Sequence, residues 1–253
     1  MRNVFAAGLF LLYVLSVQLM PVFGAETKIT VVVDNGYPPY MFGTMKQANG
    51  LYPTLIERIF THLGITVEIQ AFPWKRALKM GQEMNVAIGG IYKNDVRLTC
   101  YDYSDPLFEE CLLVYVKKGK WFLFTHLSDL QGKEIGLNRG WSYGEEFDTA
   151  RKEYHLTVQE ADTNGQNFKK LIAGRIDCLV VDQVAAYQII KQEKLEGQVE
   201  KLDRYAAVNK AYLVFAKQLK QRPVLNRFNK TLAEMKRDGT YQKIVLDYLP
   251  DLK

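Results

Sequence analysis

KITVVVDNGYPPY, residues 28–40, joins a β-branched run to a turn rich in Asp, Asn, Gly and Pro. The run Lys28 to Val33 predicts a buried strand, and Asp34-Asn35-Gly36 predicts the turn that ends it. Elements of alternating type follow: a helix over 51–63, a strand over 66–71, a helix over 75–84 and a strand over 86–91. This order predicts an α/β fold with a mainly parallel sheet and covering helices.

A second α/β unit begins after Gly119, beyond two strands expected at 101–104 and 111–117. Its strands are expected at 134–137, 157–160 and 176–181, and its helices at 142–154, 164–173 and 183–192. A strand at 211–216 and helices at 224–236 and 241–249 complete the chain.

The two units predict two lobes joined by short crossings. Lobe 1 takes residues 26–112 and 206–253, and lobe 2 takes residues 113–205. The alternative is one larger doubly wound domain. A single sheet that runs through both segments would count against the division.

The first residues predict the compartment. Arg2 precedes an almost entirely apolar stretch from Val4 to Leu19, and small or β-branched residues lie before Ala25. This pattern is typical of a cleaved secretory signal peptide, residues 1–24. A transmembrane anchor is the alternative, although no basic flank follows the stretch. With no cysteine near the cleavage site to carry a lipid, we expect a free periplasmic protein.

Composition excludes several classes of function. Removal of residues 1–24 takes away only Arg2, so the formal charge of +5 becomes +4. The basic residues form no stripe with interleaved aromatics, so we expect no nucleic-acid partner. The three histidines are isolated in the sequence, and we expect neither a metal nor a cofactor. Cys178 is interpreted as a core residue, whereas Cys100 and Cys111 are either paired or free.

Candidate binding residues follow the strands, because ligands of open α/β sheets lie beyond the carboxyl ends of the strands. In chain order they are Tyr37, Trp74, Arg76, Gly90, Tyr92, Arg97, Trp141, Ser142 and Asp182.

These residue types suit an α-amino acid or a close relative. The guanidinium group of Arg97 matches a carboxylate, and a helix that starts at Ser142 offers further donors to the same anion. Asp182 offers an acceptor for an ammonium group, and Tyr37 and Trp74 offer flat walls. Each has an ordinary alternative: a surface ion pair for Arg97, a helix cap for Asp182 and core packing for the aromatics.

In combination, several short motifs resemble the bacterial family 3 extracellular solute-binding proteins, the polar amino-acid receptors of ABC importers. The motifs are Tyr37-Pro38-Pro39-Tyr40, Arg97 with Tyr103-Ser104-Asp105-Pro106, Leu130-Gln131-Gly132-Lys133, Gly140-Trp141-Ser142, Ala173-Gly174-Arg175-Ile176-Asp177 with Asp182, and Asp238-Gly239-Thr240-Tyr241.

The resemblance implies a two-lobed type 2 periplasmic-binding fold, with Arg97 on the ligand carboxylate and Asp182 on its amino group. We expect a monomer whose partners are a small solute and an inner-membrane ABC permease or a sensor. The chain departs from the family at Gly90 and Tyr92, where small hydroxyl residues are common, and at Trp141. A bulkier, more aromatic pocket is therefore expected.

Two other functions compete with solute capture. The family has cyclohexadienyl dehydratase relatives, and an aromatic pocket would suit such a ring. No Ser-His-Asp pattern is evident, so the sequence favours a binding protein over an enzyme. A partner-binding module with a vestigial clamp is the third hypothesis.

Overall fold

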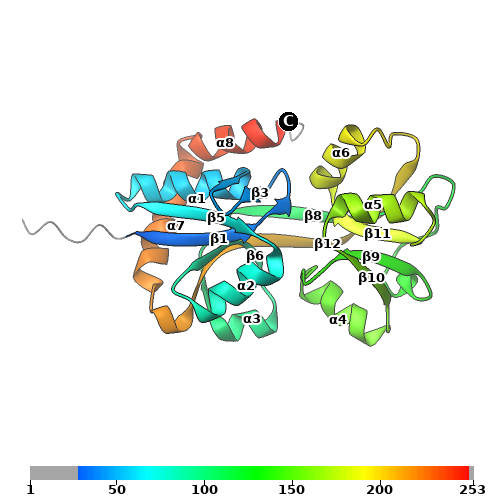
Figure 1. Cartoon of the computed structure of the whole chain (residues 1–253), viewed down its shortest axis with the longest axis horizontal. Helices are drawn as coiled ribbons and strands as arrows, with labels where there is room; N and C mark the ends of the chain where they lie inside the picture. The colour runs from blue at the N-terminus through cyan, green and yellow to red at the C-terminus, as the bar shows by residue number, and fades with distance from the viewer. Residues whose placement is uncertain (1–27, 251–253) are drawn as a thin grey trace, which may run out of the picture.

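The computed structural model describes residues 28–250 and shows two halves side by side (Figure 1). The strands are β1 (Ile29–Asp34), β2 (Gly36–Tyr37), β3 (Met41–Thr44), β4 (Gln47–Asn49), β5 (Val67–Phe72), β6 (Ala87–Tyr92), β7 (Tyr101–Tyr103), β8 (Phe108–Lys117), β9 (Glu134–Asn138), β10 (Thr157–Ala161), β11 (Cys178–Asp182) and β12 (Val199–Ala216). The predicted signal peptide lies outside the described residues.

Helices cover the strands on both faces. They are α1 (Leu51–His62), α2 (Trp74–Glu83), α3 (Asp95–Cys100), α4 (Glu145–Glu153), α5 (Asn164–Ile172), α6 (Gln183–Gln192), α7 (Arg222–Arg237) and α8 (Thr240–Tyr248), with 3-10 turns η1 (Leu127–Leu130) and η2 (Lys217–Leu219). In the part of the chain that the structure describes, no helix is both long and apolar enough to cross a membrane.

The first half consists of β1, β5 and β6 with α1, α2, α3, α7 and α8, and the second half consists of β9, β10 and β11 with α4, α5 and α6. Parallel pairing joins β1 to β5 and β6, and β9 to β10 and β11. The predicted α/β fold is thus confirmed. The parallel pairs lie toward the two ends of the sheet, however, whereas the central strands pair antiparallel.

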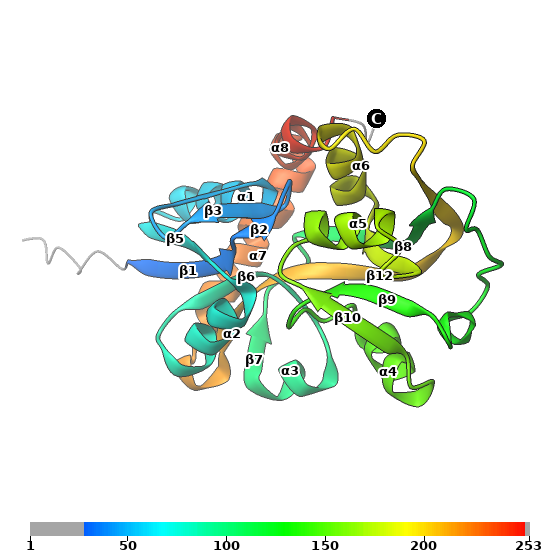
Figure 2. The same cartoon turned by 45° about the vertical axis from the view of Figure 1, so that its right-hand side comes forward.

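The long strands β8 and β12 connect the halves (Figures 1 and 2). They pair with each other and with strands of both halves, so hydrogen bonding runs from β10 through to β5 in one sheet. The crossings between the halves are themselves extended, paired strands, whereas the sequence analysis expects short crossings. This continuity counts against two separate sheets, and the division at residues 112 and 205 stays a prediction.

The apolar pattern of α1 explains its place in the first half. Leu51, Leu55, Ile56, Ile59 and Phe60 recur at helical spacing and all are buried. A second apolar cluster, which includes Phe147 and Leu137, fills the second half on the side that α4 covers. The cluster of the first half continues to Phe168 of α5 and Leu179 of β11, so the two halves share one apolar core.

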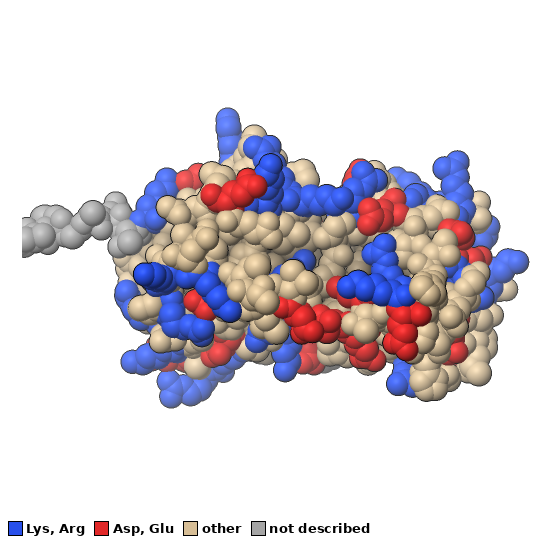
Figure 3. Space-filling view, turned by 90° about the horizontal axis from the view of Figure 1, so that it is seen from below, with Lys and Arg blue, Asp and Glu red and all other residues tan. Residues whose placement is uncertain are grey.

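The sequence analysis does not predict two features of the first half. Strands β2, β3 and β4 form a small antiparallel sheet of their own, built from the turn region after β1. Helix α3 follows β6 and carries Arg97. Both are too short for a hydrophobic period to reveal them. The surface seen from below carries basic and acidic residues interleaved rather than in separate stripes (Figure 3).

Candidate functional site

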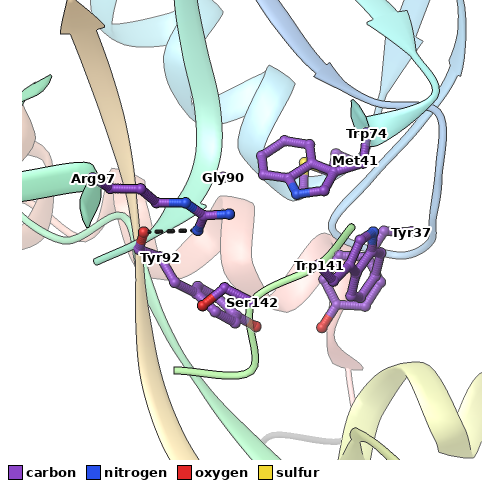
Figure 4. Close-up of a pocket in the computed structure, with 8 residues that line it drawn as sticks. All are labelled: Tyr37, Met41, Trp74, Gly90, Tyr92, Arg97, Trp141 and Ser142. Atoms are coloured by element: carbon purple, nitrogen blue, oxygen red, sulfur yellow. Dashed lines mark hydrogen bonds between the residues drawn. The ribbon is translucent and has the colours of Figure 1, made fainter. Parts of the chain in front are cut away.

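A small pocket, whose empty space of about 260 Å³ includes open solvent, lies where the two halves meet (Figure 4). Its lining residues are Tyr37, Met41, Trp74, Gly90, Tyr92, Arg97, Trp141 and Ser142. Seven of the nine residues predicted from the sequence are in this set, which shows that the structure brings them together. Whether they bind a ligand stays a prediction.

Arg97 supplies the cation of the pocket. Asn94 caps α3 by accepting a hydrogen bond from the backbone N–H of Arg97 at 2.9 Å. The guanidinium group donates to the backbone carbonyl oxygen of Tyr92 at 3.1 Å and points into the pocket (Figure 4). Burial lowers the pKa of Arg97, but a guanidinium group stays protonated in proteins. Among residues 28–250 no carboxylate forms an ion pair with it, so donors remain for an anion.

Aromatic side chains from both halves enclose the other side. Trp74 begins α2 and is buried. The ring of Trp141, from the second half, meets the ring of Tyr37 edge-on at 4.4 Å between centroids. The Nε1–H of Trp141 also donates to Asp34 in the first half at 2.9 Å. Trp141 therefore connects the two halves directly.

Ser142 lines the pocket, but not at a helix start. Helix α4 begins at Glu145, with Gly144 as its N-cap, so the predicted start at residue 142 is wrong. The hydroxyl group of Ser142 donates to Asp148 at 2.5 Å, and the same carboxylate accepts from the backbone N–H of Tyr143. The Ser142 oxygen in turn accepts long hydrogen bonds from the side-chain amide of Asn94 at 3.5 Å and from the backbone N–H of Gly144 at 3.4 Å.

Gly90 leaves space for its neighbours. Its φ of +78° lies in the left-handed region that favours glycine. A Cβ atom at this position would lie 2.7 Å from the sulfur of Met41 and 2.8 Å from the ring of Tyr52. Glycine at this position thus leaves room for Met41, which lines the pocket, and for the buried Tyr52.

Two predicted residues lie outside the lining set. Asp182 is buried and caps α6, accepting from the backbone N–H groups of Val184 and Ala185 at 2.8 and 3.0 Å. It also accepts from the hydroxyl group of Tyr40 at 2.8 Å, across the two halves. Arg76 is exposed on α2, with its guanidinium carbon 4.8 Å from the ring centroid of Phe72. The cap is the ordinary alternative that the sequence already offers for Asp182.

Glu110 is the residue that the sequence analysis misses. It lies near the start of β8 with no exposed surface. It accepts hydrogen bonds from the hydroxyl groups of Tyr37, Tyr52 and Tyr92, two of which line the pocket. The sequence holds one indication of its role: Glu110 is a charged residue between two apolar ones, Phe108 and Leu112, on the same face of a strand.

Burial raises the pKa of three carboxyl groups around the pocket. The pKa of Glu110 rises to about 8 by burial and by the negative charge of Asp182, against the opposing tyrosine hydrogen bonds. Burial likewise raises the pKa of Asp182 and of Asp34 to about 6 each, and their hydrogen bonds lower it. Perturbed acids of this kind gather at functional sites.

The three cysteines lie outside the lining of the pocket. Cys100, Cys111 and Cys178 are free thiols in the structure, and Cys178 is buried as predicted. Within residues 28–250, no group of three or more His, Cys, Asp or Glu side chains is placed to hold a metal ion.

Comparison with known proteins identifies the class. Residues 29–251 match the bacterial extracellular solute-binding proteins, family 3. The L-cystine-binding protein TcyJ of Escherichia coli K12 is 26% identical over 223 residues, which cover 85% of this chain and 80% of the relative. An ancestral arginine-binding protein bound to arginine is 27% identical, with a TM-score of 0.74 and coverage of 87% and 97%. A histidine kinase sensor domain with similarity to periplasmic binding proteins is 23% identical, with a TM-score of 0.77 and coverage of 88% and 96%.

The chain therefore belongs to the family 3 extracellular solute-binding proteins, and its fold is the two-lobed type 2 periplasmic-binding fold. The resemblance stated from the sequence motifs is confirmed. The family match and the similar solved structures show that this protein binds a solute.

Proposed function

We propose that the protein captures a small polar solute, an amino acid or a related carboxylate, in the pocket between its two halves. The observation that carries the proposal is the guanidinium group of Arg97, which points into this pocket and has only the carbonyl oxygen of Tyr92 as a hydrogen-bond partner in the described chain. A ligand carboxylate accepts two parallel hydrogen bonds from such a group, and burial strengthens them.

The lining of the pocket supports capture by closure. Tyr37, Trp74 and Arg97 come from the first half, whereas Trp141 and Ser142 come from the second. A ligand that touches both sets binds the closed arrangement better than an open one, and this difference in affinity drives a hinge motion. We place the moving parts at residues 26–112 with 206–253 and at residues 113–205, with β8 and β12 as the hinge.

The relatives indicate the class of ligand. TcyJ is an L-cystine-binding protein, and the ancestral neighbour was solved with arginine, so both carry an amino acid. We infer that the ligand of this chain shares the α-carboxylate. We further propose that the protein is a periplasmic monomer that delivers its ligand to an inner-membrane ABC permease. The sensor-domain neighbour makes a signalling partner the alternative.

A screen of ligands tests the proposal. Purified mature protein is heated with each of the common amino acids, with polyamines and with small carboxylates. A ligand that binds only the folded state raises stability by about 2.7 kcal/mol at a hundredfold excess over its dissociation constant. We expect at least one amino acid to raise the melting temperature, with saturable binding in calorimetry. A screen in which no carboxylate-bearing compound stabilises the protein contradicts the proposal.

The pocket lining favours binding over catalysis. It contains no carboxyl, imidazole, thiol or amine side chain that could act as a general base at neutral pH. The nearby acids with a raised pKa are Glu110, Asp182 and Asp34, and none of them is among the lining residues; Glu110 lies behind the tyrosines. Incubation with prephenate and arogenate separates the two functions, and product formation above the uncatalysed rate would establish a dehydratase-like enzyme.

A further inference from the structure

Glu110 sits directly behind one wall of the pocket. Its carboxylate has no exposed surface, and its side-chain partners are the hydroxyl groups of Tyr37, Tyr52 and Tyr92. The hydroxyl groups of Tyr37 and Tyr92 point to the same side of the pocket, away from the guanidinium group of Arg97 (Figure 4). The pocket is therefore polarised, with a cation at one end and an acid behind the other.

Within the part of the chain that the structure describes, Glu110 forms no ion pair with a cationic side chain. Among the ion pairs of residues 28–250, none involves Glu110 or Asp182, whereas the neighbouring Glu109 pairs with Lys210 at 3.9 Å on the surface. A buried carboxylate without a countercharge is costly unless it is protonated or a cation arrives. Two such carboxyls lie close enough here for Asp182 to raise the pKa of Glu110.

The tyrosines can transmit this charge to the pocket. Each hydroxyl group that donates its proton to Glu110 keeps its oxygen lone pairs, so toward a ligand it acts as an acceptor. Hydrogen bonds in such a chain polarise one another in a medium of low dielectric constant. An N–H donor of the ligand, and above all a cationic one, is therefore favoured where the tyrosine oxygens lie.

We propose that Glu110 makes the site selective for a ligand that carries a cationic nitrogen at the end remote from its carboxylate, acting through Tyr37 and Tyr92. Glu110 is a positioning residue in this scheme, and the tyrosine oxygens face the ligand. The inference rests on the proposed function, because Arg97 must hold the carboxylate for the opposite end to reach the tyrosines.

Matched pairs of amino acids test the inference by calorimetry. Arginine is compared with citrulline, and ornithine with norvaline, because the members of each pair share a carbon skeleton and differ in the terminal charge. Wild type should prefer the cationic member by about tenfold or more, which corresponds to roughly 1.4 kcal/mol. Glu110→Gln should reduce this ratio to about threefold or less, whereas the surface control Glu109→Gln should keep it.

Proton release on ligand binding is a second measurement, and it would be unaffected by Glu110→Gln if Glu110 had only a structural role. The titratable groups that face Glu110 are Tyr37, Tyr40, Tyr52, Tyr92, Cys111 and Asp182. A bound cation favours the ionised form of Glu110, so wild type should release protons on binding the cationic member near pH 7, and its affinity should rise toward pH 8.5. Calorimetry in two buffers of different ionisation enthalpy measures the release, which Glu110→Gln should abolish.

The outcomes separate the inference from the proposed function. If neutral members bind as tightly as cationic ones, or if Glu110→Gln keeps both the preference and the proton release, the inference is wrong and solute capture stands. If no amino acid binds, the proposed function fails and the inference with it. Tyr37→Phe is the second variant, used if Glu110→Gln does not fold, and it should lower the same ratio because it removes one of the two relaying oxygens.

Discussion

The two ends of the pocket differ in how much of their hydrogen-bonding capacity the protein itself uses. At one end, Arg97 donates to a single backbone carbonyl group and leaves further donors for a ligand. Behind the other end, Asp182 already accepts from the cap of α6 and from Tyr40, and Glu110 accepts from three tyrosines. A polar group with unused capacity in a pocket is a candidate for direct ligand contact, whereas a satisfied group acts on stability or through its partners.

Arg97→Ala should cause the largest loss of affinity. The ligand carboxylate would lose its charged partner inside the pocket, and we expect binding to weaken about 100-fold, or roughly 3 kcal/mol. Arg97→Lys should restore only part of this loss, because an ammonium group cannot form two parallel hydrogen bonds with a carboxylate. Isothermal titration calorimetry measures both, and equal dissociation constants for wild type and Arg97→Ala would remove Arg97 from the site.

Asp182 should affect stability before it affects binding. Asp182→Ala removes the cap of α6 and leaves the hydroxyl group of Tyr40 without its partner, at a cost of about 2 kcal/mol. Asp182→Asn keeps a capping oxygen and should lose less. Urea denaturation of the ligand-free protein measures the difference, and equal losses for the two variants would contradict the capping role.

The same pair of variants tests the role that the family resemblance implies for Asp182. If Asp182→Asn weakens an amine-bearing ligand while its stability stays near that of wild type, the ligand amine is bound by Asp182. A ligand without an amine is the control, since its affinity should then be unchanged.

Stability should depend on pH because three buried acids hold protons in the folded state. Burial raises the pKa of Asp34 and Asp182 to about 6 and of Glu110 to about 8. In the unfolded chain these groups ionise near pH 4, so the stability they confer is complete below that pH and is lost as the pH rises toward 8. We expect the free energy of unfolding to fall by at least about 1 kcal/mol between pH 5 and pH 8.

Glu110→Gln tests the largest of these pKa shifts separately from the other two. Because glutamine does not titrate, the variant should show a flatter pH profile between pH 6 and pH 8 than wild type. Denaturation at several pH values without ligand measures both profiles. Parallel profiles for the two proteins would show that Glu110 ionises in the folded protein as it does in the unfolded chain.

Arg76→Ala should have the smallest effect. The sequence names Arg76 as a site residue because it follows a strand, but the structure places it on the exposed side of α2 above Phe72. We expect a change in ligand affinity of less than about 0.5 kcal/mol. A tenfold loss in calorimetry would mean that Arg76 reaches the ligand in the bound state.

The part of the fold that could be predicted is the part marked by a strong period of apolar residues or by short motifs. The apolar stripe of α1 and the β-branched run of β1 lie where the sequence predicts them, and α6 has the predicted bounds Gln183–Gln192. The rest depends on tertiary pairing. β12 extends from Val199 to Ala216, whereas its polar first part predicts no strand until residue 211.

The candidate site divides in the same way. Residues that come soon after a predicted strand, such as Tyr37 and Trp74, are found by position alone. Glu110 lies inside a strand, and only the long-range approach of Tyr37 and Tyr52 makes it part of the site. A sequence rule that looks at strand ends cannot detect such a residue, because its partners are far away in the chain.

The central claim is that Arg97 recognises the carboxylate of the ligand, and one thermodynamic cycle tests it most directly. Ornithine and putrescine differ by the carboxylate, and calorimetry gives the affinity of each for wild type and for Arg97→Ala. We predict that wild type prefers ornithine by about 100-fold and that Arg97→Ala brings the two ligands to within about threefold. An unchanged preference in Arg97→Ala would contradict the account, because the carboxylate would then be bound by another group.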